Sequence, residues 1–457
     1  MRANAIPTVA PDEAVQAVQS GDHVHLSATS NAPHCLIAAL CRRGRAGALR
    51  DVHIHHLHTE GPAPYADPAF EGVFQLDSFF VGPNVRSWTQ QGYADYIPVF
   101  LGETQRLYRE GYLPCDVALI QVSPPDEEGN VSLGTSVDAS VAAVEKARVV
   151  IAAMNSFVPF TYGDGVIPAS RIHCFVEDNA PLETVRFTEP DAVEAAIGRN
   201  CAALIEDGAT LQMGIGAIPN AVLSQLSGHK NLGIHTEMFA DGVIPLVEKG
   251  VINGANKAID RGKMVATFLL GSKKLYDYVH RNDAVLMKDV GYTNDPFILS
   301  RNPKVTAINS ALQVDLTGQI CADSLGTKCY SGVGGQIDFF YGASRSAGGK
   351  AILAMPSATD KKVSKIAPVL TPGAGVVTTR AHAHWIVTEY GAVNLYGRPL
   401  QERARLLIGI AHPDHREALD RAAFERFGPH YHFVRQHAAP VRDGAGQPAE
   451  SKSKPES

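Results

Sequence analysis

The chain has 457 residues, of which 45% are hydrophobic and 19% are charged, a composition typical of globular proteins and not of disordered or fibrous ones. Its formal net charge of −6 argues against a dedicated nucleic-acid binder but leaves small anionic ligands open. The N-terminal residues lack the apolar core of a signal peptide, and the sequence contains no apolar run long enough to predict a membrane span.

The seven cysteines are spread along the chain and form no CxxC pair. An odd number of isolated cysteines argues against a disulfide framework or a zinc ribbon and favours a reducing compartment. We therefore expect a cytoplasmic protein without a metal site.

Short apolar runs alternate with longer amphipathic stretches. The amphipathic stretches typical of helices are 36–44, 192–208 and 221–229, and the runs typical of buried strands are 148–155, 284–289, 351–356 and 384–391. This alternation predicts α/β units around mostly parallel sheets.

Two pairs of motifs repeat in the same order. Pro33 and Pro219 each follow a strand-like run and a loop of small residues. Each proline precedes apolar residues at +3, +4 and +7, which form one face of a helix that has the proline in its first turn. Asp126 and Asp315 then begin similar DxxG turns at nearly the same distance from those prolines. The double repeat predicts two related α/β domains.

The predicted boundary between these domains falls in the segment DNAPLETVRFTEPD. We expect an N-terminal domain over residues 1–185 and a C-terminal domain over residues 186–437. The polar stretch 438–457, rich in proline, glycine and serine, predicts a disordered tail.

The segment LQMGIGAIPNAV (211–222) is typical of a strand, a glycine loop and the start of a helix. Gly214 and Gly216 allow a sharp turn and the close approach of a ligand, and the free N–H groups at the helix start favour an anion. An ordinary strand-to-helix turn has the same pattern. A dinucleotide site requires a third glycine where Pro219 stands, which disfavours a nicotinamide-dependent dehydrogenase.

Glu237 stands at the expected end of the next strand. In a parallel sheet this residue and the loop at 214–216 meet at the same carboxyl edge. A second glycine loop, GVGG at 332–335, follows strand-like residues further along. A carboxylate beside two loops of backbone donors is a candidate nucleophile with an oxyanion hole, because an ordinary glutamate is ionised at neutral pH. A solvated loop acid is the alternative interpretation.

The chain resembles the class I CoA-transferases of the acetyl-CoA hydrolase/transferase family, in particular the 4-hydroxybutyrate and butyrate:acetate CoA-transferase branch. The resemblance covers the chain up to the C-terminal tail. The motifs that carry it are FFVGPNVR (79–86), DVALIQVSPPDEEGNVSLG (116–134), GIGAIPNAV (214–222), HTEMFADG (235–242), INSALQVDLTGQI (308–320) and GVGGQIDF (332–339).

The resemblance implies that Glu237 attacks the acyl-CoA carbonyl. The residues that it implies for CoA binding and the oxyanion hole are Gly214, Ile215, Gly216, Ala217, Ile218, Asn309, Gly332, Gly334, Gly335 and Lys350. Relatives often carry a lysine where this chain has Ala347, which leaves the neighbouring Lys350 as the basic residue of this segment.

The implied reaction moves CoA between acetyl-CoA and a short-chain carboxylate, such as 4-hydroxybutyrate or butyrate, through a glutamyl-CoA thioester. CoA and acyl-CoA are then substrates, and no permanently bound cofactor, nucleic acid or membrane is implied. Relatives imply a homodimer or a homotetramer. The alternatives are an acyl-CoA hydrolase that uses the same glutamate and a catalytically silent CoA-binding subunit.

The acceptor acid is not specified by any clear selector residue. We expect the acceptor pocket in the N-terminal half, for example around residues 58–70. The cluster HIHHLH (53–58) is expected to be structural, because on a strand His53 and His55 face one way while His56 and His58 face the other. One of these histidines beside the acceptor pocket is the alternative.

Overall fold

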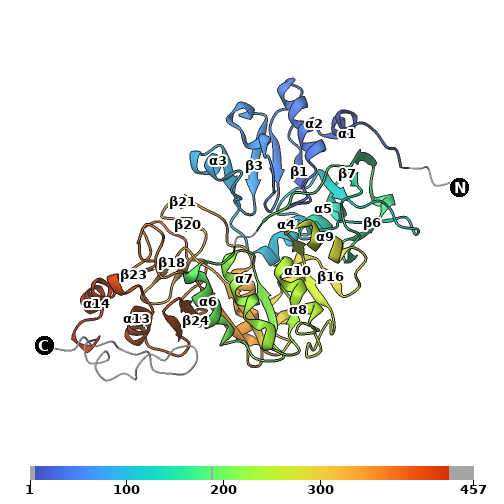
Figure 1. Cartoon of the computed structure of the whole chain (residues 1–457). Helices are drawn as coiled ribbons and strands as arrows, with labels where there is room; N and C mark the ends of the chain where they lie inside the picture. Colours follow the sequence, from blue (N-terminus) through green and yellow to red (C-terminus); the bar gives the residue numbers. More distant parts are fainter. Residues whose placement is uncertain (1–5, 187–188, 432–457) are drawn as a thin grey trace.

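The computed structural model describes residues 6–186 and 189–431, so the predicted tail at 438–457 lies outside the described residues. The N-terminal half is built on a parallel sheet with the strand order β10-β7-β5-β1-β2-β3-β4 (Figure 1). Its strands are β1 (His23–Leu26), β2 (Val52–His55), β3 (Phe74–Ser78), β4 (Ala94–Tyr96), β5 (Val117–Val122), β7 (Val149–Asn155) and β10 (Cys174–Asp178). Strand β5 is buried along its whole length, as expected of a parallel strand that is covered on both faces.

The C-terminal half carries a second sheet with the order β12-β11-β17-β22-β24-β25. Its strands are β11 (Thr210–Met213), β12 (Gly233–Ile234), β17 (Val305–Asn309), β22 (Lys350–Ala354), β24 (Trp385–Thr388) and β25 (Gly391–Asn394). All neighbouring pairs are parallel except β24 and β25. The predicted α/β fold with mostly parallel sheets is confirmed.

The two sheets share one strand order. The series β2-β1-β5-β7-β10 in the first sheet corresponds to β12-β11-β17-β22-β24 in the second. Asp126 and Asp315 follow β5 and β17, and each carboxylate accepts the N–H four residues further on, at 2.8 Å and 2.9 Å. The sequence His-Thr-Glu also occurs twice, after β2 at 58–60 and after β12 at 235–237. Glu60 is therefore the counterpart of Glu237 in the N-terminal half.

The helices have the apolar faces that the sequence predicts. In α2 the residues Leu36, Ile37 and Leu40 are buried, and Val222 and Leu223 are buried in α7. The described α-helices are α1 (Pro11–Ala14), α2 (His34–Arg45), α3 (Arg86–Gln91), α4 (Thr104–Arg109), α5 (Ser140–Lys146), α6 (Ala192–Ala202), α7 (Ala217–Ser224), α8 (Ile244–Glu248), α9 (Lys273–Val279), α10 (Val290–Thr293), α11 (Pro296–Leu299), α12 (Gln336–Arg345), α13 (Leu400–Gly409) and α14 (Pro413–Phe427).

Helix α6 is shorter than the predicted stretch 192–208. It begins at a capping box made by Asp191 and Glu194. Its end tightens into turns, in which the N–H groups of Leu204 and Ile205 bond to carbonyls three residues back. The two side chains nevertheless stay buried, so the apolar pattern continues past the end of the helix.

The two halves are interlocked. Strand β8 (Tyr162–Gly163) of the N-terminal half pairs with β16 (Val285–Met287), which also pairs with β14 (Met264–Ala266). The largest apolar cluster draws on residues of both halves. The domain boundary near residue 186 therefore stays a prediction.

The remaining small sheets join β13 (Met238–Phe239) to β15 (Phe268–Leu269), β18 (Gln313–Asp315) to β19 (Ile320–Cys321) and β23 (Ile366–Ala367), β20 (Ser324–Leu325) to β21 (Lys328–Cys329), and β6 (Asn130–Ser132) to β9 (Val166–Pro168).

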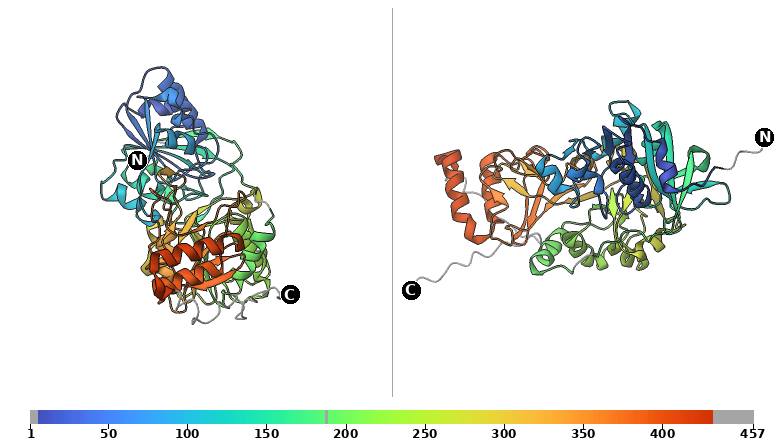
Figure 2. Two further views of the ribbon diagram at one scale, coloured as in Figure 1. Left: turned by 90° about the vertical axis from the view of Figure 1, so that its left-hand side faces the viewer. Right: turned by 90° about the horizontal axis from the view of Figure 1, so that it is seen from above.

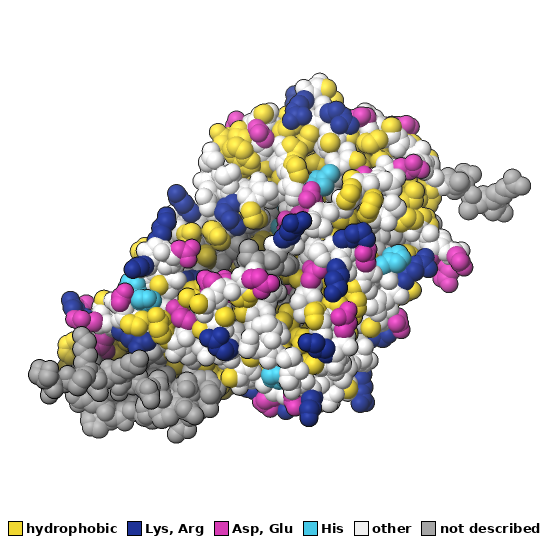
Figure 3. Space-filling model, viewed as in Figure 1, with side chains coloured by type: hydrophobic (Ala, Val, Ile, Leu, Met, Phe, Trp, Pro, Cys, Tyr) yellow, Lys and Arg dark blue, Asp and Glu magenta, His cyan; other side chains and the backbone are white. Residues whose placement is uncertain are grey.

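Helices α13 and α14 lie side by side at the end of the molecule away from the first sheet (Figure 2). On the face seen in Figure 3, acidic and basic side chains are interspersed, in keeping with the small net charge of the chain. Within residues 6–186 and 189–431, no helix has both the length and the apolar character needed to cross a bilayer.

Candidate active site

Glu237 lies in the short break between β12 and β13, at the carboxyl edge of the second sheet. Its carbonyl accepts the N–H groups of residues 267 and 268, each at 3.0 Å. The hydroxyl of Thr236 lies 3.1 Å from the carbonyl oxygen of Met213, the last residue before the first glycine loop. These bonds fix the backbone at Glu237 and tie it to that loop, as the sequence predicts.

The first glycine loop exposes its backbone. Nothing lies within 4 Å of a Cβ built on Gly214 or on Gly216, and Gly216 has a φ of +119°, which favours glycine. Helix α7 begins at Ala217, so the N–H groups of its first turn lack partners within the helix. Ile215 and Ile218 pack against the apolar core and hold the loop in place. The open space over this backbone can accept a ligand.

The second glycine loop is held by the carboxyl edge of the first sheet. A Cβ on Gly332 would come within 2.8 Å of the ring of Phe80, so this close approach requires glycine. Three hydrogen bonds from residues that end or follow β3 and β4 fix the loop: Val81 N–H to the Ser331 carbonyl at 3.0 Å, Leu101 N–H to the Gly334 carbonyl at 3.0 Å, and the Tyr96 hydroxyl accepting the Val333 N–H at 2.9 Å. The site is therefore assembled from both halves of the chain.

The carboxylate of Glu237 lies at the start of α12. It interacts with the backbone N–H of Gly335, the N-cap residue of that helix. A Cβ on Gly335 would overlap both Oε2 of Glu237 and the amide of Asn294. Nδ2 of Asn294 lies 3.2 Å from the same Oε2. Burial raises the pKa of Glu237 to about 7, although the bonds from Asn294 and Gly335 oppose this shift.

Asp338 places a second carboxyl group in the same cluster. Its Oδ2 accepts the N–H of Gly102 at 3.0 Å and lies 3.2 Å from Nδ2 of Asn294. Burial raises the pKa of Asp338 to about 7, the two hydrogen bonds lower it, and the nearby charge of Glu237 raises it. One amide group therefore connects two carboxyl groups whose ionised forms are both disfavoured by burial.

Sequence analysis missed both Asn294 and Asp338. Asp338 follows the second glycine loop by three residues, and an acid in the first turn of a helix after such a loop is a usable signal. Asn294 lies in GYTNDPF, which contains no local pattern that indicates a site. Its role comes from the tertiary fold alone.

Asn309 lies with the rest of the site, but Lys350 does not. Asn309 ends β17 at the carboxyl edge, and its Nδ2 donates to the side-chain oxygen of Gln212 at 2.9 Å. Lys350 begins β22 at the opposite edge of the sheet, where its ammonium group pairs with Glu206. The position of Lys350 in the sheet does not support a contact with CoA. That contact stays a prediction from the family resemblance.

Only His53 and His55 of HIHHLH lie on β2, on one face as expected, because the strand ends at His55 and His56 and His58 follow it. His53 and His55 stack with His23 at centroid distances of 4.6 Å and 5.1 Å. His56 faces the hydroxyl of Tyr65 at 2.9 Å, and burial lowers the pKa of His56 to about 3. His58 packs against Phe80 and Phe268, beside the two site segments. The part of the chain that the structure describes holds no cluster of three or more potential metal ligands.

Comparisons with known proteins show the family of the chain. The acetyl-CoA hydrolase/transferase N-terminal domain matches residues 7–186, and the C-terminal domain of the same family matches residues 271–423. The succinyl-CoA:acetate/propanoyl-CoA:succinate CoA transferase of Fasciola hepatica is 46% identical over 91% of this chain and 87% of its own length. The 4-hydroxybutyrate coenzyme A transferase of Clostridium kluyveri is 46% identical over 92% of this chain and 97% of its own.

Two solved structures have the same fold over almost the whole chain. RipA from Yersinia pestis has 34% identity and a TM-score of 0.86, covering 92% of this chain and 97% of that one. The 4-hydroxybutyrate CoA-transferase of Porphyromonas gingivalis has 37% identity and a TM-score of 0.79, covering 92% and 98%. The chain therefore belongs to the acetyl-CoA hydrolase/transferase family and is an enzyme of the CoA-transferase type.

Proposed function

We propose that this enzyme moves CoA between acetyl-CoA, or a similar acyl-CoA, and a short-chain carboxylate, with Glu237 as the nucleophile. The observation that carries the proposal is the placement of the Glu237 carboxylate, which is held by Asn294 at the start of α12, in a cluster to which both halves of the chain contribute. The names of the relatives from Clostridium kluyveri and Fasciola hepatica support CoA transfer to a small acid.

In the first half of the reaction the ionised carboxylate of Glu237 attacks the thioester carbonyl carbon. The C–S bond breaks, CoA leaves as a thiolate, and a mixed anhydride joins the acyl group to Glu237. The thiolate then attacks the glutamyl carbonyl carbon of this anhydride, and the donor acid leaves as its carboxylate. The resulting glutamyl-CoA thioester retains the energy of the original thioester, so the cycle needs no other energy source.

In the second half the acceptor carboxylate attacks the glutamyl-CoA thioester and expels the CoA thiolate again. The thiolate attacks the acceptor acyl carbon of the new anhydride, and the Glu237 carboxylate is the leaving group. Each addition passes through a tetrahedral oxyanion. Backbone N–H groups can stabilise that charge, and loss of one such donor in other enzymes costs about 3 kcal/mol.

The two glycine loops have separate proposed tasks. Residues Gly214–Ile218, whose backbone has open space over Gly214 and Gly216, bind CoA and supply N–H groups to the oxyanion. Asn309, Gly332, Gly334 and Gly335 line the same CoA site. The partial burial of Glu237 weakens the hydration of its carboxylate, which favours attack over solvation.

The acceptor is proposed to be a short acid of the size of 4-hydroxybutyrate or butyrate. His58, which packs between Phe80 and Phe268, places part of segment 58–70 beside the site, where the acceptor pocket is expected. An acceptor panel of propionate, butyrate, 4-hydroxybutyrate and succinate, with acetyl-CoA as the donor, identifies the preferred acid.

The test of the nucleophile is mass spectrometry of the enzyme incubated with acetyl-CoA. We expect a CoA adduct on the peptide that contains Glu237, which hydroxylamine converts to a glutamyl hydroxamate with release of CoA, and neither product on the peptide that contains the counterpart Glu60. Glu237→Gln should lose both the adduct and the transfer activity. Transfer by the wild type without an adduct at Glu237 contradicts the proposal, and release of free CoA without a new acyl-CoA identifies a hydrolase instead.

A further inference from the structure

Asp338 and Glu237 are connected by one amide group. The two hydrogen atoms on Nδ2 of Asn294 serve Oε2 of Glu237 and Oδ2 of Asp338, each at 3.2 Å. Asn294 is buried, and its Oδ1 has no hydrogen-bond partner among the described residues. Among the described residues, the two carboxyl groups are therefore the only hydrogen-bond partners of the Asn294 side chain, and they orient its amide.

Asp338 is fixed on its other side by the N-terminal half. The N–H of Gly102 donates to the same Oδ2 at 3.0 Å, and Asp338 sits in the first turn of α12, where a negative charge is favoured. With these two donors on one oxygen and only 6% of its surface exposed, Asp338 is not placed to attack a substrate. Its contact with the reaction runs through Asn294.

We propose that Asp338 is a positioning residue that sets the orientation and the charge of Glu237 through the shared amide of Asn294, so that the two carboxyl groups hold one negative charge between them in the free enzyme. The inference rests on the proposed role of Glu237 as the nucleophile. In the reactive form the proton is on Asp338 and Glu237 is ionised. Two adjacent carboxyl groups in one buried cluster commonly share a proton in this way.

The proton balance follows the charge on Glu237. When Glu237 is esterified with CoA it carries no charge, so Asp338 no longer faces a carboxylate and can release its proton to water. When the Glu237 carboxylate is regenerated, Asp338 takes a proton up again. A cavity of about 530 Å³, whose walls include Gly102, Asn294 and Asp338, provides the water for this exchange.

Few other charged groups face the pair. Glu103 raises the pKa of Asp338 through its negative charge, and its own carboxylate lies 3.5 Å from Arg106 at the cavity wall. His382 and Asp295 line the same cavity, and the Asp295 carboxylate is occupied in capping α11.

Two histidines belong to segments that adjoin Glu237: His235 precedes it by two residues, and His58 contacts Phe268, whose N–H donates to the Glu237 carbonyl. His235 is buried and bonds to the Thr293 carbonyl, and burial lowers its pKa to about 3, so it is neutral. Burial also lowers the pKa of His58 to about 4. The two carboxyl groups are therefore coupled through the amide of Asn294, and the charge of Glu237 raises the pKa of Asp338.

The test compares the pH dependence of kcat/KM for Asp338→Asn and Asn294→Ala with that of the wild type. Asp338 is protonated in the reactive form, so Asp338→Asn, which keeps an oxygen for Gly102 and Asn294, should leave the acid limb in place. The variant cannot ionise at residue 338, so the fall in kcat/KM at alkaline pH that ionisation of Asp338 causes in the wild type should be absent. Asn294→Ala removes the donor that favours the ionised Glu237, so the acid limb should move to higher pH. Asp277→Asn on α9, which removes an exposed carboxylate, is the matched control and should leave both limbs in place.

A folded Asp338→Asn enzyme with slower turnover and an alkaline limb like that of the wild type overturns the inference, because a purely structural role has that effect. If Asp338→Asn does not fold, the wild-type profile decides: a bell shape with two ionisations supports the inference, and a single ionisation overturns it. The CoA adduct at Glu237 is measured in each variant. Its absence in the wild type refutes the proposed function, whereas its presence with coincident pH profiles refutes only the coupling to Asp338.

Discussion

Arg109 of α4 forms an ion pair with Asp289 across the two halves of the chain, with Nη2 2.8 Å from Oδ2. Asp289 also accepts the N–H of Gly291 at 2.7 Å and caps α10, the short helix that ends just before Asn294. The pair therefore links the N-terminal half to the turn that carries the amide on Glu237.

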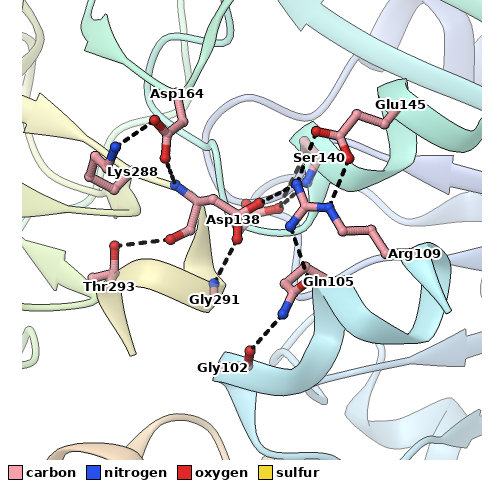
Figure 4. Close-up of polar contacts among 11 residues, drawn as sticks. Gly102, Gln105, Arg109, Asp138, Ser140, Glu145, Asp164, Lys288, Gly291 and Thr293 are labelled. Carbon is pink, nitrogen blue, oxygen red and sulfur yellow. Dashed lines mark hydrogen bonds and ion pairs between the residues drawn. The ribbon is translucent and has the colours of Figure 1, made fainter. Parts of the chain in front are cut away.

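A wider network supports this pair (Figure 4). Glu145 binds Arg109 at 2.7 Å, and Lys288 binds Asp164 at 2.6 Å. The second oxygen of Asp164 accepts the N–H of Asp289 at 3.0 Å. Asp164 and Arg109 both belong to the N-terminal half. That half therefore holds Asp289, at the start of α10, through two separate contacts.

Arg109→Ala should lower both stability and activity. The substitution leaves the buried carboxylate of Asp289 without its cation, and because Arg109 is itself partly exposed we expect a loss of about 2 kcal/mol in the free energy of unfolding, less than for a fully buried pair. The freed turn also lowers kcat, since Asn294 loses its fixed place. Urea denaturation and steady-state kinetics measure the two effects.

The matched control for that substitution is Arg106→Ala on the same helix. Arg106 pairs with Glu110 at the exposed surface, where solvent screening leaves such pairs little effect on stability. Equal loss of stability in the two variants would show that the ion pair between Arg109 and Asp289 contributes no more to the free energy of unfolding than an exposed pair does.

Gly335→Ala should abolish adduct formation without unfolding the protein. Gly335 has a φ of −96°, which alanine adopts readily, so the backbone is not strained. The added methyl group instead overlaps the Glu237 carboxylate and the Asn294 amide. We expect a loss of at least about 100-fold in kcat, comparable to loss of an oxyanion donor.

Gly228→Ala is the control for this steric argument. A Cβ on Gly228 meets nothing within 4 Å, so the variant should retain wild-type kinetics. Circular dichroism and thermal melting of both variants separate a blocked site from a misfolded chain. Normal turnover in Gly335→Ala would mean that Glu237 lies elsewhere in the working enzyme.

The sequence predicted the parts of the site that are local in the chain. Glu237 and the loop at 214–218 share one strand-loop-helix-strand unit, so their common edge follows from the rule for parallel sheets. The apolar faces of α2 and α7 followed from the spacing of residues after Pro33 and Pro219.

The parts that sequence could not predict depend on contacts between distant segments. Asn294 and Asp338 reach Glu237 from α10 and α12, and no periodic pattern specifies that meeting. Lys350 shows the reverse case. Its place in a glycine-rich motif suggested a ligand contact, but it begins β22 at the amino edge, whereas Asn309 ends β17 at the carboxyl edge.

The rate of CoA transfer should fall below neutral pH. Burial raises the pKa of Glu237 to about 7, and only the ionised carboxylate attacks the thioester. The value of kcat/KM should therefore drop about tenfold for each pH unit below 7. A profile that stays flat down to the ordinary range of a glutamate would contradict the burial of this carboxylate in the free enzyme.

Glu237→Gln should stabilise the protein at alkaline pH. The pKa of Glu237 is higher in the folded chain than in the unfolded one, because burial disfavours the charge. A group of this kind contributes stability at low pH that is lost as the pH rises through the folded value of about 7. The neutral glutamine avoids that loss, so at pH 8 we expect a gain of about 2 kcal/mol in the free energy of unfolding.

The pH dependence distinguishes this effect from a general change in packing. The difference between Glu237→Gln and the wild type should shrink as the pH falls toward the ordinary range of a glutamate, where Glu237 is protonated in the folded chain. Glu127→Gln removes an exposed carboxylate and should change stability little at either pH. If the charge on Glu237 destabilises the folded protein, removing that charge must raise the free energy of unfolding. Equal stability of Glu237→Gln and the wild type at pH 8 would therefore show that the carboxylate is well solvated in the free enzyme.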